Sequence, residues 1–71
     1  MYRSDVVNYI KEDLLQSPEV EYTWVNKICN LALVDEQMYK KLSHYMEEMD
    51  SSKKLKLYKE MKLFYVDYFS M

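Results

Sequence analysis

Residues 35–49, DEQMYKKLSHYMEEM, carry the clearest structural pattern in this chain of 71 residues. Apolar side chains recur at spacings of three and four, which places them on one face of an α-helix, and charged side chains fill the other face. Asp35 is the predicted N-cap, because its carboxylate can accept hydrogen bonds from the first backbone amides. We therefore expect an amphipathic helix after Asp35. Its predicted inward residues are Met38, Leu42, Tyr45, Met46 and Met49.

The segment that follows predicts a second helix, over residues 53–69. Asp50, Ser51 and Ser52 have the side chains typical of a turn and an N-cap. One continuous helix through this point stays open as an alternative, since neither Gly nor Pro interrupts the chain there. The predicted buried face of the C-terminal helix consists of Leu57, Tyr58, Met61, Phe64, Tyr65 and Tyr68.

The first half of the chain predicts two more helices. Ser4 is the expected cap of a helix that ends near Gln16, and Ser17 with Pro18 has the pattern of an N-cap followed by proline at the first helical position. The next helix would then cover residues 18–33. Its apolar residues extend around more than half of its circumference, so it is either the central helix of the domain or a helix that also meets a partner.

Together these patterns predict an all-α fold. Strand-like alternation and hairpin dipeptides are missing, and the connections between the expected helices are short. We expect one domain over residues 1–71, a single compact bundle of about four short antiparallel helices.

Composition argues against catalysis. The chain has no Gly, which removes the glycine-rich phosphate loops and the usual nucleophile elbow. Cys29 and His44 are the single cysteine and the single histidine, and the helical phases direct them to different sides. We predict that Cys29 is a buried packing residue and that His44 is a solvated surface residue. The sequence thus predicts a protein that is not an enzyme and has neither cofactor nor metal site.

Charge and hydropathy indicate where such a chain works. The formal net charge is −2, and the longest uncharged run, residues 28–34, is far too short to span a membrane. A lone cysteine and an N-terminus unlike a signal peptide predict a reducing, cytoplasmic setting. The scarcity of Ala, Gly, Pro and Arg beside many Lys, Tyr and Met indicates an AT-rich genome, as in a bacteriophage or a low-GC bacterium.

Eight Tyr and six Met are more than a small solitary core needs, and both residue types are enriched at protein interfaces. We therefore expect a non-catalytic module that binds another protein, with a homodimer as an open alternative. The favoured interpretation is a small inhibitor or regulator, in the setting of a phage accessory protein that blocks a host or defence enzyme by steric occlusion. The predicted contact residues are Tyr22, Leu55, Leu63, Tyr65 and Val66.

A lysine row along the expected C-terminal helix provides the alternative, a small nucleic-acid-binding regulator. Clustered cations and interleaved aromatic rings suit phosphates and bases. A step of three residues drifts by about 60° on a helix, however, so the row sweeps across the helix surface and does not line one groove. The candidate nucleic-acid residues are Lys53, Lys56, Lys59 and Lys62.

Overall fold

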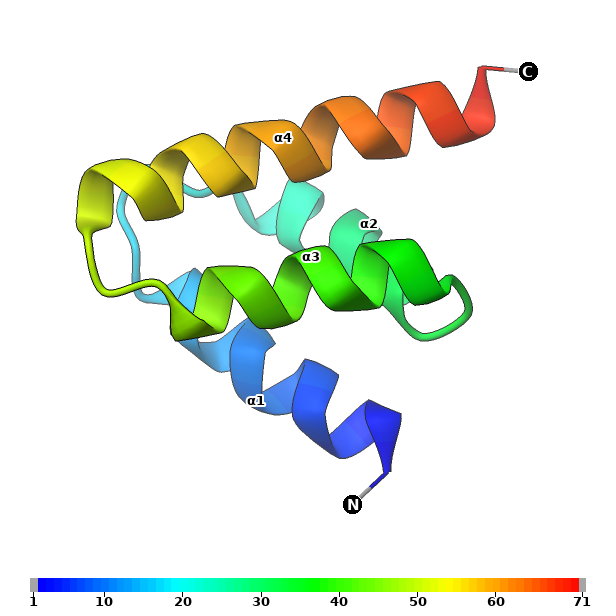
Figure 1. Cartoon of the computed structure of the whole chain (residues 1–71), viewed down its shortest axis with the longest axis horizontal. Coiled ribbons are helices and arrows are strands. Elements are labelled where there is room, and N and C mark those ends of the chain that lie inside the picture. Colours follow the sequence, from blue (N-terminus) through cyan, green and yellow to red (C-terminus); the bar gives the residue numbers. More distant parts are fainter. Residues whose placement is uncertain (1, 71) are drawn as a thin grey trace.

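The computed structural model describes residues 2–70, and within them the chain is all-α, as predicted. The four helices are α1 (Arg3–Leu15), α2 (Tyr22–Ala32), α3 (Glu36–Glu47) and α4 (Ser51–Phe69). In Figure 1 α3 and α4 run in opposite directions, joined by the short connection at residues 48–50. The molecule measures about 32 × 28 × 19 Å along its principal axes.

The two middle helices form the centre of the bundle. Both α2 and α3 pack against α1 and against α4, whereas α1 and α4 lie on opposite sides of the central pair. This arrangement explains why α2 is apolar around most of its circumference, since it is covered from two sides. The structure therefore supports the central position for α2 over a face left open for a partner.

Helical periodicity accounts for the core. The residues in it are at most 4% exposed, and the inward stripe predicted after Asp35 supplies three of them, Met38, Leu42 and Tyr45. The core consists of Val7, Ile10, Leu14, Val25, Ile28, Cys29, Leu31, Ala32, Met38, Leu42, Tyr45, Tyr58 and Met61.

Two aspartates define helix starts in the second half of the chain. The Asp35 carboxylate accepts a hydrogen bond from the Met38 amide at 2.9 Å, which confirms the predicted cap of α3. The Asp50 carboxylate accepts from the Ser52 and Lys53 amides at 2.8 and 3.2 Å. Helix α4 thus begins at Ser51, two residues earlier than predicted, and α3 and α4 are separate helices.

The prediction for Met49 was wrong. Because α3 ends at Glu47, Met49 falls in the connection to α4, where its side chain is 95% exposed instead of continuing the inward stripe. The Glu48 carboxylate accepts hydrogen bonds from the Met49 and Asp50 amides, which stabilises the extended connection.

The predicted start of α2 at Pro18 was also wrong. Residues 17–20 form a turn in which the Val20 amide donates to the Ser17 carbonyl, and α2 begins only at Tyr22. The Tyr58 hydroxyl of α4 accepts a hydrogen bond from the Glu21 amide at 3.3 Å. A side chain from a distant part of the sequence therefore satisfies a backbone amide at the start of α2, where the local cap at Ser17 was expected.

Helix α1 starts at Arg3, so Ser4 lies inside it and is not its cap. Arg3 forms an ion pair with Glu36 of α3, and its guanidinium lies 4.6 Å from the ring centre of Tyr39. These contacts attach the first turn of α1 to α3. They stabilise the N-terminus of α1, where no side chain forms a capping hydrogen bond.

Candidate interaction surface

The C-terminal half of α4 exposes large apolar side chains. Leu63 is 68% exposed, Val66 52%, Tyr68 43% and Phe69 61%; we call these four residues the α4 surface. Helix α4 has 19 residues, against 11 in α2 and 12 in α3. At 1.5 Å per residue it is about 10 Å longer than either neighbour, so its neighbours cannot cover its full length.

Aromatic rings contact two members of the α4 surface, Tyr68 and Phe69. The Trp24 ring of α2 meets Tyr65 edge to face at 5.7 Å between ring centres, and Tyr65 lies 4.7 Å from Phe69. Phe69 in turn lies 5.0 Å from Tyr68, which lies 6.2 Å from Phe64. These distances are typical of favourable aromatic pairs. The exposed rings are therefore held in place by partly buried ones.

Lysine side chains surround the aromatic cluster. The Lys27 ammonium lies 4.8 Å from the Trp24 ring centre, and the Lys62 ammonium lies 5.1 Å from the same ring on its α4 side. On the α3 side, Lys41 lies 5.2 Å from the ring centre of Phe64. Such contacts each contribute about 0.5–1 kcal/mol at exposed sites. We call Lys27, Lys41 and Lys62, which contact rings next to the α4 surface, the lysine rim.

The predicted contact residues do not all share one surface. Leu63 and Val66 are exposed about one turn apart on α4, whereas Tyr65 is half-buried and packs against the Phe69 ring. Leu55 instead packs against the core near the start of α4. Tyr22 is 61% exposed and lies on the same side of α2 as Cys29, two turns further on. Burial raises the pKa of the Cys29 thiol, and Lys11 of α1 is close enough for its charge to act in the opposite direction, so this side of α2 faces α1 and Tyr22 is not part of the α4 surface.

Sequence reasoning missed two members of the α4 surface. Tyr68 was assigned to the buried face and Phe69 was assigned to no surface, because helical phase alone does not show where the neighbouring helices end. The predicted helix lengths contained a hint of this exposure, because the C-terminal helix was expected to be about one turn longer than the helix within residues 35–49. Val34, 78% exposed beside Phe69, was also missed.

The lysine row is partly occupied within the protein. Lys53, Lys56 and Lys59 are exposed, whereas Lys62 is half-buried between the Trp24 and Tyr58 rings. The row therefore offers three solvated lysines on successive turns, each rotated from the last.

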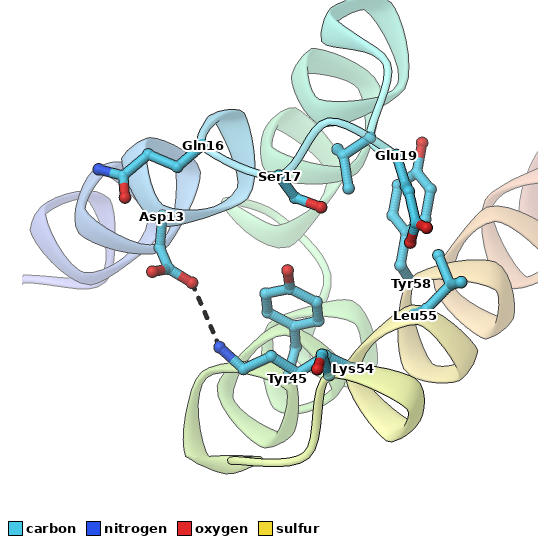
Figure 2. A pocket seen from close by; sticks show the side chains of 10 residues that line it. Asp13, Gln16, Ser17, Glu19, Tyr45, Lys54, Leu55 and Tyr58 are labelled. Carbon is cyan, nitrogen blue, oxygen red and sulfur yellow. Dashed lines mark hydrogen bonds and ion pairs between the residues drawn. The ribbon is translucent and has the colours of Figure 1, made fainter.

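A cavity of about 260 Å³ lies at the junction of α1, the 17–20 turn and the start of α4 (Figure 2). Lys54 crosses it and forms an ion pair with Asp13 of α1 at 3.4 Å, while its ammonium lies 4.9 Å from the Tyr45 ring centre. Burial, followed by the nearby Asp13 charge, raises the pKa of the Tyr45 hydroxyl. We interpret the cavity as the place where the Lys54–Asp13 ion pair connects α4 to α1, two helices that otherwise do not pack together.

Cys29 and His44 lie apart in the fold. Cys29 is 3% exposed in the core, and burial raises the pKa of its thiol to about 11, with the nearby Lys11 acting in the opposite direction. His44 is exposed on α3, and within residues 2–70 no three His, Cys, Asp or Glu side chains are grouped as metal ligands would be. A thiol with this pKa stays protonated near pH 7 and is a poor nucleophile.

Searches against known protein families, curated proteins and solved structures found no match to this chain. The described helices include none with the length and apolar content needed to cross a bilayer.

Proposed function

We propose that the protein is a non-catalytic protein-binding module, a small regulator or inhibitor that acts by covering part of another protein. The observation that carries the proposal is the α4 surface, where four large apolar side chains are exposed over one end of one helix. Large apolar side chains that are exposed together on one part of a small protein commonly mark interaction sites. The mechanism is steric, because the bound domain excludes other ligands from the area that it covers.

The aromatic cluster suits this role. Aromatic side chains are common anchors of binding energy in protein interfaces. Ring contacts already order Tyr68 and Phe69 in part in the free protein, which lowers the side-chain entropy lost on binding. The surrounding lysines would then select the partner and its orientation.

Composition supports the biological setting. The amino-acid usage, rich in residues with AT-rich codons, fits a bacteriophage as well as a low-GC bacterium, and we propose that the module is a phage accessory protein directed at a host or defence enzyme. A second copy of the chain is the other protein partner to test. Sedimentation at several concentrations distinguishes a homodimer from a module that binds a different protein.

Affinity capture from native lysate tests the function with matched variants. Leu63→Gln combined with Val66→Gln removes two apolar side chains of the α4 surface without adding charge. Tyr9→Gln on α1 changes a comparably exposed apolar residue, 64% exposed, on the other side of the bundle. We expect wild type and Tyr9→Gln to retain one protein partner that the double variant loses. Equal capture by all three, or recovery of nucleic acid alone, would refute the proposal.

Nucleic-acid binding is the second candidate, and the exposed Lys53, Lys56 and Lys59 support it. A complex held by phosphate contacts weakens steeply between about 50 and 200 mM salt, whereas an apolar protein interface changes little. Anisotropy of a labelled oligonucleotide across this salt range measures the difference. Substituting the three lysines with Gln should abolish any such binding while leaving protein capture unchanged.

A further inference from the structure

We propose that the α4 surface takes an acidic amphipathic segment of another protein, one that presents apolar side chains flanked by Asp or Glu. This inference rests on the proposed function and specifies the chemistry of the partner. Three observations support it: the charge around the surface, the way in which its lysines are held, and the shape of the neighbouring groove.

The charge around the α4 surface is opposite to that of the rest of the protein. Lys27 contacts the neighbouring Trp24 ring, Lys41 contacts the Phe64 ring, and Lys59 and Lys62 come from α4 itself. The same part of α4 also contains two carboxylates, Glu60 and Asp67, so this region has four positive and two negative charges. The remaining charged residues of the chain are six Lys and Arg and ten Asp and Glu, so the rest of the protein has a net negative charge. Charge complementarity therefore favours an acidic partner at this place.

The rim lysines are not neutralised by neighbouring carboxylates. The ion pairs within residues 2–70 are Arg3 with Glu36 and Lys54 with Asp13, and neither involves the rim. Lys27, Lys41 and Lys62 lie against ring faces instead. A ring face positions an ammonium but cancels little of its charge, so an incoming carboxylate would gain charge-assisted hydrogen bonds at a prepared site.

A groove beside the α4 surface fits an apolar side chain. It lies between α2 and the end of α4, has a volume of about 200 Å³, and is formed mainly by Leu31, Val34, Tyr65 and Phe69, with Lys27 at its edge. The volume accommodates one large apolar side chain. A segment that places an apolar residue in this groove would bring its flanking acidic residues toward Lys27 and Lys62.

The same charge argues against a second copy of this chain as the occupant. A twofold symmetric dimer would place the α4 surface of one copy on that of the other. The lysine rims would then face each other, and like charges across an interface disfavour association.

Selection from a random peptide library tests the inference. Peptides of 16 residues are displayed and selected on the immobilised wild-type protein, after depletion on the Leu63→Gln, Val66→Gln variant. We expect enriched peptides with apolar residues at helical spacing and more Asp and Glu than Lys and Arg. Charge reversal by Lys27→Glu with Lys62→Glu should weaken the best synthetic peptide by about tenfold or more. Lys40→Glu with Lys53→Glu is the matched control, which should have less than about threefold effect.

The outcomes separate the two proposals. Enriched peptides that depend on the α4 surface but carry no acidic excess would overturn the partner chemistry and leave the binding function intact. Peptides that bind the double Gln variant equally, or no enrichment at all, would overturn both. Binding of the wild type to an oligonucleotide or to anionic phosphatidylserine vesicles, lost in Lys27→Glu with Lys62→Glu, would assign the lysine rim to phosphate groups and contradict an acidic protein partner. A dimer in sedimentation that the double Gln variant abolishes would likewise contradict it.

Discussion

Replacing exposed and buried apolar residues of α4 by the same amide distinguishes an interaction surface from a core. Leu63 is 68% exposed and Val66 52%, so folding removes about a third of one side chain and half of the other from water. Full burial of such side chains contributes about 1.5–3 kcal/mol each. Leu63→Gln with Val66→Gln should therefore lower the free energy of unfolding by about 1–2 kcal/mol, partly offset because Gln favours helix more than Val does.

Met61 is the internal reference for this experiment. It lies on the same helix but is 0% exposed, and Met61→Gln places an amide without hydrogen-bond partners in the core. We expect a loss of about 3–5 kcal/mol, much of the total stability of about 4–10 kcal/mol expected for a domain of this size. Urea unfolding followed by circular dichroism at 222 nm measures both variants. A double Gln variant as unstable as Met61→Gln would show that Leu63 and Val66 are buried in solution and would refute the exposed surface.

Further predictions concern the joints of the fold. Tyr58→Phe removes the hydroxyl that accepts the Glu21 amide and should cost about 0.5–1.5 kcal/mol in unfolding free energy, with faster hydrogen exchange at Glu21; unchanged exchange would exclude this cap. A double-mutant cycle on Lys54 and Asp13, both partly exposed, should give a coupling below about 1 kcal/mol that shrinks in high salt, and a salt-independent coupling would contradict an ion pair. Because burial raises the pKa of Cys29 from 9.0 to about 11, the unfolded state loses its thiol proton first and stability should fall as pH rises through this interval. Cys29→Ala should flatten that slope in urea unfolding at pH 8.5 and 10.5, and equal slopes would refute it.

The features that the sequence predicted correctly depend on local interactions. The buried positions Met38, Leu42 and Tyr45 follow from helical spacing, and the Asp35 cap of α3 needs only a residue three positions away. The start of α2 could not be predicted in this way. The Glu21 amide at the start of α2 donates to the Tyr58 hydroxyl, 37 residues distant. The helix therefore begins where this tertiary contact forms, and not at the local cap pattern of Ser17 and Pro18.

The candidate surface was predictable in part. Helical phase correctly places Leu63 and Val66 away from the core of α4. It places Leu55 on the same side, yet Leu55 lines the cavity beside Val20 of the 17–20 turn, a neighbour that a helical projection does not include. Phe69 is exposed because α4 is longer than the helices that it packs on. The extent of a surface therefore depends on the relative lengths and positions of helices, which no single helical pattern contains.

Site-specific photocrosslinking tests the central claim most directly. A benzophenone amino acid replaces Val66 on the α4 surface in one variant and Asn8, exposed on the far helix α1, in the other. After irradiation in native lysate, we expect a discrete protein adduct from position 66, none from position 8, and loss of the adduct when Leu63→Gln is added. An adduct from position 8 alone, or from neither position, would contradict a protein-binding role for this surface.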